Sequence, residues 1–355
     1  MEEIKALRAR LHECPRLSGA EEGTAALIAE FLRENTTLEL HPEGPRLWCA
    51  HREPGTAETV AFRADVDAIP AQGGGAFHGC GHDGHSAVLA GLALFLEGKT
   101  LGKNVLLLFQ DREETGQGAR PFRDSLLERE KIDRIYGFHN LPGWPAGTIL
   151  SRPGTFACAS RGFLARVEGE QSHAAYPEQG RNPAPLLSRM VLALPELRTR
   201  TGYDGLLMAT VVGLRAGGDN FGVSAGEGSL SLTLRSTSLE ALEEYQRRIE
   251  EYLTEECARS GMTLSCGVRD DFPDTVSDGP LLEDARRRWS EQKLPQQTLE
   301  EPMRWSEDFG WYLKKIPGVY FGLGAGEAWP GLHTPGYEFN DAILERGVEA
   351  LAALL

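Results

Sequence analysis

The stretch FHGCGHDGHSAV, residues 77–88, places a cysteine, three histidines and an aspartate among glycines. Thiolates, imidazoles and carboxylates are the side chains that bind borderline divalent ions such as Zn²⁺. Cys80 and His82 are the candidate ligands within this stretch. A short cluster of this kind also arises by chance, so its meaning depends on whether further donors occur along the chain.

The composition limits the classes of protein to consider. The chain has 355 residues and 41% hydrophobic residues, which predicts two domains with cores of ordinary size. Its net charge of −15 repels phosphate backbones, so nucleic-acid binding is not expected. The sequence shows no apolar run long enough for a membrane span and no apolar leader. The six cysteines are scattered without a CxxC pair, and we expect a reducing cytoplasmic setting.

The first 160 residues alternate between apolar strands and helices, after two opening helices. This alternation predicts an α/β fold with an open, mixed sheet of parallel character, flanked by helices. Buried strands are expected at residues 59–69, 104–111 and 134–140, and helices at residues 86–98 and 118–129.

The pattern changes at residue 161 to that of a compact α+β unit. A strand is expected there, followed by a helix at 182–200 capped by Asn182, paired strands at 207–217 and 228–237, and an amphipathic helix at 238–261. The last segments lack a core of their own; they are a helix at 281–293, a strand at 319–324 and a helix at 341–355. We therefore expect a catalytic, metal-binding domain of residues 1–160 and 272–355, with residues 161–271 as an inserted domain.

Further metal donors stand where predicted strands end. Strand ends in an open α/β sheet point side chains into a common crevice, which is where such folds bind ligands. Five donors exceed one tetrahedral shell, so the site would hold two ions, or one ion with open positions. The donors are Cys80 and His82, one of the pair Glu113–Glu114, His139 and His333.

Each donor alone has an ordinary structural interpretation. A single histidine is commonly a hydrogen-bonded structural residue, adjacent glutamates commonly form a solvated face, and a lone cysteine commonly packs as a small apolar residue. Their shared placement at the ends of elements favours a metal site. Of the paired glutamates, one can bind metal while the other acts as general base on a water whose pKa the metal lowers towards ~7. That chemistry is hydrolysis of an amide.

Seven segments, in this order, carry a more specific resemblance. They are RADVDAIP (63–70), HGCGHDGH (78–85), FQ and EE within 109–114, the strand ending at His139, SHAAYP (172–177), SEDFGWY (306–312) and LHTPGYEFND (332–341). Over nearly its whole length the chain resembles the amidohydrolase family of hippurate hydrolase, indoleacetyl-amino-acid hydrolases, N-acyl-amino-acid aminoacylases and N-acetyldiaminopimelate deacetylase. This family is related to the aminoacylase and carboxypeptidase G metallopeptidases.

The resemblance implies a two-metal catalytic domain and an inserted lid domain that mediates dimerisation. It implies that Glu113 is the general base and that His173, on the lid, reaches the substrate from its own or the partner subunit; an ordinary surface histidine is the alternative. Asn220 and Arg235 keep polar lid positions that would bind substrate. The implied metal ligands are Cys80, His82, Glu114, His139 and His333, with Asp65, Asp67 and His85 orienting them.

The expected function is metal-dependent hydrolysis of N-acyl amino acids or similar small amides, by a homodimer using Zn, Mn, Co or Ni. One alternative is a dipeptidase or aminopeptidase with the same metal centre, which would need a free amine on its substrate. Another is a non-catalytic ligand-binding relative, but no ligand or base is missing. The chain departs from the family in its short loop at 71–76 and in Asp111–Arg112, where the family carries Pro-Ala. Because of these departures, the sequence does not predict which acyl group the substrate carries.

Overall fold

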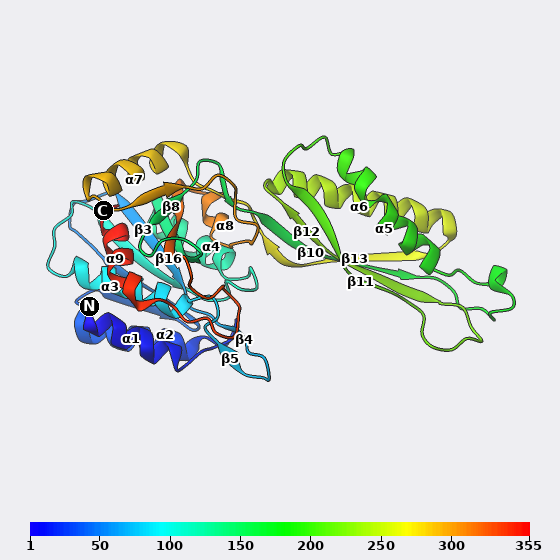
Figure 1. Ribbon diagram of the computed structural model, residues 1–355, viewed down its shortest axis with the longest axis horizontal. Coiled ribbons are helices and arrows are strands. Elements are labelled where there is room, and N and C mark those ends of the chain that lie inside the picture. Colours follow the sequence, from blue (N-terminus) through cyan, green and yellow to red (C-terminus); the bar gives the residue numbers. More distant parts are fainter. The chain divides into compact units, whose positions relative to one another are not determined.

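The computed structural model describes residues 1–355 and divides them into two compact units (Figure 1). Unit 1 comprises residues 1–156, 275–303 and 307–355, and unit 2 comprises residues 157–274 and 304–306. Unit 2 is therefore an insertion into the chain of unit 1. None of the helices combines the length and the apolar character needed to cross a membrane.

Unit 1 is built on an eight-stranded mixed sheet in the order β1-β2-β6-β3-β7-β16-β8-β15. The four central strands, β6, β3, β7 and β16, run parallel, so their carboxyl ends lie at one edge of the sheet. The strands are β1 (Glu39–Glu43), β2 (Arg46–His51), β3 (Thr59–Asp65), β6 (Asn104–Gln110), β7 (Arg134–Pro142), β8 (Ile149–Ser151), β15 (Gln296–Thr298) and β16 (Gly318–Gly326). Two short pairs complete the unit: β4 (Ile69–Pro70) with β5 (Ala76–Phe77), and β9 (Thr155–Ala157) with β14 (Thr275–Val276).

Helix α3 is the central helix of unit 1. After a polar first turn it is apolar around its whole circumference, which suits its packing against α1, α9 and β3, and almost all its residues are buried. The helices of this unit are α1 (Glu2–His12), α2 (Glu22–Asn35), α3 (His82–Leu96), α4 (Ala119–Glu130), α7 (Gly279–Glu291), α8 (Gly310–Leu313) and α9 (Leu344–Ala352), with a 3₁₀ turn at Asp341–Ile343.

Several expected boundaries in unit 1 were wrong. Helix α3 begins at His82 instead of residue 86, because Gly81 takes a left-handed N-cap with φ 89°. Strand β3 ends at Asp65 instead of residue 69, and β7 continues past residue 140 to Pro142. The terminal helix is shortened by the 3₁₀ turn that precedes it, and α7 starts earlier than expected, at Gly279, because the Asp278 side chain caps it.

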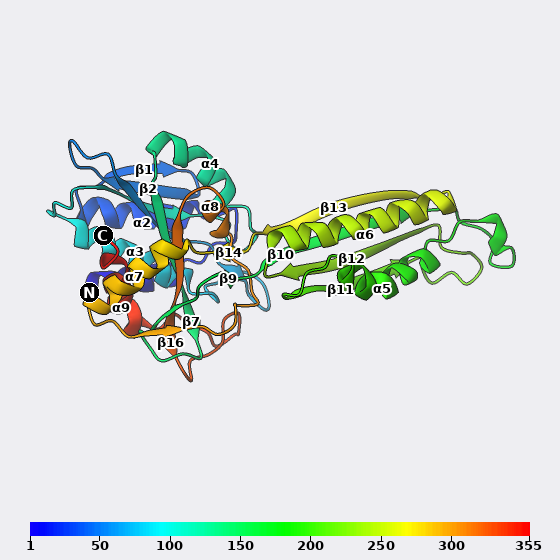
Figure 2. The same ribbon diagram turned by 90° about the horizontal axis from the view of Figure 1, so that it is seen from above.

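Unit 2 is a four-stranded antiparallel sheet in the order β11-β12-β10-β13, with α5 and α6 on one face (Figure 2). The elements are β10 (Ala159–Glu168), α5 (Ala184–Thr199), β11 (Leu207–Ala216), β12 (Glu227–Ser236), α6 (Leu239–Ser260) and β13 (Thr263–Phe272), with a 3₁₀ turn at Pro177–Gln179. Strand β13 was not expected from the sequence, although Leu264, Cys266 and Val268 alternate along its first half. Most of its side chains are exposed, and its second half is charged. The cap of α5 was also off by one residue: Pro183 is the N-cap, although Asn182 Oδ1 accepts the N–H of Ala184 at 2.9 Å.

Candidate metal centre

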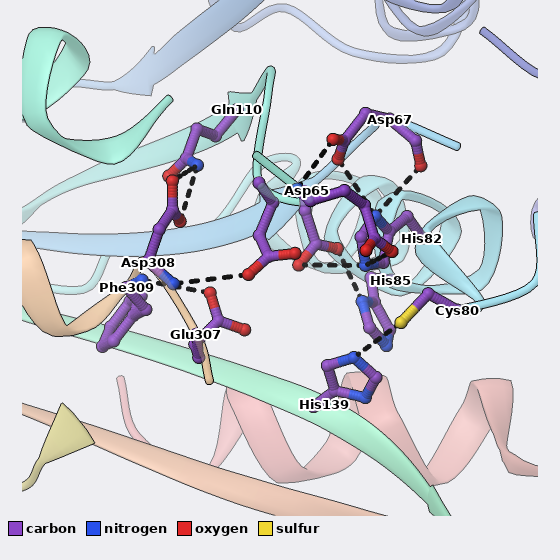
Figure 3. Close-up of polar contacts among 12 residues, drawn as sticks. Asp65, Asp67, Cys80, His82, His85, Gln110, His139, Glu307, Asp308 and Phe309 are labelled. Carbon is purple, nitrogen blue, oxygen red and sulfur yellow. Dashed lines mark hydrogen bonds and ion pairs between the residues drawn. The ribbon is translucent and has the colours of Figure 1, made fainter. Parts of the chain in front are cut away.

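The cysteine of the HGCGHDGH stretch lies between two imidazoles at the carboxyl edge of the unit 1 sheet. Cys80 Sγ is 3.4 Å from His139 Nε2 and 3.3 Å from His333 Nε2. Figure 3 shows the sulfur directed at the His139 ring. His139 lies within β7, and His333 lies in the loop after β16, so parallel neighbours bring donors together that are far apart in the sequence.

His82 has one ring nitrogen held and the other unpartnered. Its Nδ1 is 3.0 Å from the Asp67 carbonyl oxygen and 3.1 Å from Asp67 Oδ1, so Nδ1–H donates to Asp67. Its Nε2 is buried without a hydrogen-bond partner, 3.8 Å from Glu114 Oε1, which is also buried without one. Buried polar atoms left in this way cost free energy unless a ligand binds them. A cation between these two atoms would satisfy both.

Two overlapping donor groups share the Cys80 thiol. One is Cys80, His82 and His139, and the other is Cys80, Glu114 and His333; the donor atoms within each group all lie within 4.8 Å of one another. Thiolate, imidazole and carboxylate donors match the preferences of zinc and neighbouring divalent ions. The residues present therefore fit a divalent metal centre, and two such groups have room for two ions.

His333 reaches this centre through an unfavourable backbone conformation. Its φ is 62°, in the left-handed region that a residue with a Cβ rarely occupies. Its N–H donates to the Gly79 carbonyl oxygen at 2.8 Å, which holds the loop against the HGCGHDGH stretch. Strain of this kind is retained where the surrounding structure enforces it and is concentrated at functional sites.

The electrostatics of the centre favour a cation. Burial opposes protonation of His82, but the carboxylates of Asp65 and Asp67 outweigh it and raise the pKa of its ring to about 10. Burial raises the pKa of the Cys80 thiol well above its usual value, and the Glu114 and Glu113 carboxylates add to the effect. The carboxylates around the site thus favour protons on the His82 ring and on the Cys80 thiol. A divalent ion would supply positive charge in place of those protons.

Glu113 lies beside the donors with one oxygen held by the backbone. Its Oε1 accepts the N–H of Asp308 at 3.3 Å, and its carboxylate falls within 4.8 Å of donor atoms of both His82 and Glu114. Burial raises the pKa of Glu113 well above its usual value, and the nearby Glu307 and Glu114 carboxylates raise it further. A carboxylate in these surroundings binds a proton readily, as a general base must.

A buried ionic network behind Glu113 was not foreseen as part of the site. Arg63 donates to Asp65 Oδ2 at 2.7 Å and to Asp308 Oδ1 at 2.6 Å, and Gln110 Nε2 lies 2.9 Å from both Asp308 oxygens. Burial, more than any other cause, raises the pKa of Asp308 to about 8. Arg63 belongs to the RADVDAIP segment and Asp308 to the SEDFGWY segment. Nothing in the sequence indicates that these two residues, 245 positions apart, form a hydrogen bond.

The three residues expected to orient the ligands, Asp65, Asp67 and His85, are each held by hydrogen bonds to their neighbours. His85 Nδ1 donates to Asp65 Oδ1 at 2.6 Å, and His85 Nε2 accepts the N–H of Asn140 at 3.1 Å. Asp67 binds His82 through Oδ1, while its Oδ2 accepts the Glu114 N–H at 2.9 Å. These hydrogen bonds fix the orientation of the His82 ring and of the Glu114 backbone. Residues that hydrogen-bond to metal ligands commonly have this role.

The Asp111–Arg112 pair turns away from the donors. Asp111 is buried and pairs with Arg46, whose Nε lies 3.0 Å from Asp111 Oδ1. Arg112 Nε is 3.6 Å from Asp111 Oδ2, and its guanidinium lies next to Gly19. Arg112 therefore forms a salt bridge with its neighbour Asp111.

The three residues expected on a lid domain, His173, Asn220 and Arg235, lie in unit 2, at two different ends of it. Asn220 and the exposed His173 lie together, because His173 forms a bridge with Val223 in the Asn220 loop. His173 Nδ1 accepts the N–H of Ala175 at 3.0 Å, so Nε2 carries the proton and is free to donate. Arg235 is near the other end of β12, roughly 25 Å away along the strand, and donates to Ser306 Oγ at 3.0 Å. One chain therefore does not bring Asn220 and Arg235 together at a single small substrate.

The fold and the donor cluster define a metal-dependent amidohydrolase. The family model for Peptidase family M20/M25/M40 matches residues 61–355, and the chain belongs to this family. It is 29% identical to "IAA-amino acid hydrolase ILR1-like 2" of Arabidopsis thaliana over 98% of this chain and 83% of that protein. It is 27% identical to the N-acetyldiaminopimelate deacetylase of Exiguobacterium sibiricum over 94% of each chain.

The fold recurs in the solved structure of Bacillus subtilis YXEP protein, described as a dinuclear metal binding peptidase from the M20 family. The TM-score is 0.83 at 24% identity, covering 99% of this chain and 96% of that one. At this level of identity the similarity establishes a shared fold, and the site must be argued from its own residues.

Proposed function

We propose that the protein hydrolyses the amide bond of N-acyl amino acids, releasing a carboxylic acid and an amino acid. The observation that carries this proposal is the gathering of four further metal donors around Cys80, with the carboxylate of Glu113 beside them. The names of the curated relatives support the substrate class, since they specify an IAA-amino acid and an N-acetylated amino acid.

In the proposed mechanism, the bound ions would polarise the amide carbonyl and lower the pKa of the attacking water. Glu113 would take the proton of that water and deliver it to the leaving amine. The Asp308 N–H holds one Glu113 oxygen and leaves the other free for the proton. Metal ligation is assigned to Cys80, His82, Glu114, His139 and His333.

We propose a dimer in which the His173 end of each unit 2 serves the metal centre of its partner. His173 and Asn220 lie at the end of unit 2 opposite to Arg235, and Arg235 lies near the residues where the chain crosses to unit 1. His173 Nε2–H would donate to the substrate carbonyl oxygen. Arg235 has no carboxylate partner and would bind the carboxylate of the amino acid.

We also propose zinc or manganese as the native ion and the cytoplasm as the setting. The Cys80 thiolate favours zinc among borderline ions. All six cysteines are free thiols, which suits a reducing compartment.

The test is a substrate screen on protein stripped of metal and reconstituted separately with Zn, Mn, Co and Ni. The panel pairs N-acetyl, N-benzoyl and N-indoleacetyl amino acids with free dipeptides of matched side chains, and the released amine is measured. The expected result is hydrolysis of the capped substrates, lost on chelation. Cleavage restricted to substrates with a free amine would identify a dipeptidase or aminopeptidase and would reject the proposal.

A further inference from the structure

The turn Arg16–Glu21 between α1 and α2 supplies no metal donor. It contacts the loop after β3, which contains Asp67, and the loop after β6, which contains Arg112 and leads into Glu113 and Glu114. The Ala68 N–H donates to the Arg16 carbonyl oxygen at 2.7 Å, and Ser18 Oγ donates to Asp67 Oδ2 at 2.7 Å. Asp67 is the residue that holds both the His82 ring and the Glu114 N–H. Ser18 therefore stabilises the carboxylate that aims two ligands.

Glu21 is the buried acid of this turn. Its side chain is fully buried, and its two oxygens accept backbone N–H groups, Oε1 from Arg112 at 2.9 Å and Oε2 from Gly19 at 2.7 Å. Glu21 is the N-cap residue of α2, yet its side chain makes no capping bond to that helix. An ordinary helix-capping role thus does not account for a carboxylate that is costly to bury.

The hydrogen bond from the Arg112 N–H to Glu21 bears on the metal centre because Arg112 directly precedes the two glutamates of the site. Arg112 has φ 55°, a left-handed conformation unfavourable for any residue with a Cβ, and it immediately precedes Glu113 and Glu114. The turn is closed on its other side by the Gln117 N–H, which donates to the Arg112 carbonyl oxygen at 3.1 Å. Without Glu21, the backbone would relax away from the left-handed region and rotate the two glutamates.

We propose that the turn Arg16–Glu21 is a positioning element of the metal centre, in which Glu21 sets the directions of Glu113 and Glu114, and Ser18 steadies Asp67. Glu21 acts through the Arg112 backbone and touches no reacting atom. The role deepens the proposed function and rests on the metal centre assigned there.

The first test compares Glu21→Gln with Glu22→Gln. Glutamine keeps the size of the side chain but turns an NH₂ group towards one of the two backbone N–H donors. Glu22 is the exposed neighbour, so its substitution makes the same change of side chain without touching the loop. We expect Glu21→Gln to lower kcat at least tenfold with KM within about twofold, and Glu22→Gln to leave both unchanged.

The second readout needs no substrate. Cobalt-substituted protein reports its coordination geometry through visible absorption, and we expect altered bands in Glu21→Gln and wild-type bands in Glu22→Gln. Replacing Arg112 by glycine removes the Cβ penalty at φ 55°, so Glu21→Gln/Arg112→Gly should regain part of the lost kcat and of the wild-type spectrum. This rescue separates positioning from general loss of structure.

Ser18→Ala tests the other half of the turn, and because it removes one hydroxyl it keeps the proposal testable if Glu21→Gln does not fold. We expect a change in the cobalt bands and a smaller fall in kcat. Wild-type cobalt bands in Glu21→Gln, or in Ser18→Ala when only that variant folds, would overturn the proposal. If wild-type protein cleaved no N-acyl amino acid but the bands shifted as expected, the proposed substrate would fall and the positioning role would stand.

Discussion

Glu113 sits where a general base would act, with one oxygen on the Asp308 N–H and the metal donors within reach. Glu113→Gln keeps the size and the backbone contact but cannot accept the proton. We expect kcat to fall about 100- to 10,000-fold while bound metal, measured by elemental mass spectrometry, stays at the wild-type level. Hydrolysis at the wild-type rate with full metal content would show that another group is the base.

Glu21 gives a pH dependence of stability whose sign can be worked out. Burial raises the pKa of Glu21 to about 7 from its ordinary 4.5. The folded chain therefore keeps this proton between about pH 4.5 and 7 while the unfolded chain loses it, so the group's contribution to stability falls as pH rises through that window. Above pH 7 both states are ionised and the contribution is constant.

Glu21→Gln removes this titration. Relative to wild type, we expect its free energy of unfolding to increase by about 3 kcal/mol on going from pH 4.5 to pH 8. Urea unfolding of metal-free protein, followed by tryptophan fluorescence, measures the difference at each pH. Five of the six tryptophans lie in unit 1, so the signal reports mainly the unit that contains Glu21. A difference independent of pH would show that Glu21 has an ordinary pKa.

The sequence indicates candidate donors more readily than the residues that support them. Cys80, His82 and the glutamate pair could be proposed as donors because each stands at the end of an apolar run or a helix, which is a local pattern. Glu21 could not be found, because it holds backbone N–H groups, one of them 91 positions away, and those carry no sequence signature. The same holds for Ser18, which meets Asp67 across a turn whose shape only the fold defines.

At the scale of elements, the strands that position the site were the predictable ones. Strands β3, β6, β7 and β16 are buried on both faces and read as continuous apolar runs. Strands β1 and β15, at the edges of the sheet, are short and partly polar, and they owe their conformation to pairing with a neighbour. Such strands have no periodicity of their own for a sequence to display.

The start of α3 is the element boundary on which the centre depends. A Cβ at Gly81 would lie 2.6 Å from Tyr337 Oη and 2.7 Å from Asn140 Nδ2, in addition to the strain of φ 89°. We expect Gly81→Ala to destabilise unit 1 by about 2–4 kcal/mol in urea unfolding. Gly55→Ala is the control: it has φ 82° with no atom within 4 Å of the added Cβ, so only the conformational cost of about 1–2 kcal/mol applies. Equal losses in both variants would show that packing around Gly81 contributes nothing.

At the scale of the whole molecule, unit 2 separates two sets of polar groups by the length of its sheet. Arg235 pairs with Ser160 near the start of unit 2, whereas His173 and Asn220 lie beyond the far end of β10 and β12. A small N-acyl amino acid is far shorter than the roughly 25 Å between them. If both sets act on one substrate, they must come from two copies of the chain.

This arrangement predicts complementation between two inactive proteins. A Glu113→Gln chain lacks the base but has an intact His173, and a His173→Ala chain has an intact metal centre but cannot serve its partner. Refolding an equal mixture would give hetero-dimers with one complete site each, and random pairing predicts about a quarter of the wild-type activity. Each variant refolded alone is the control and should remain inactive. If the mixture is no more active than the two controls while sedimentation shows dimers, then His173 serves the centre of its own chain or none.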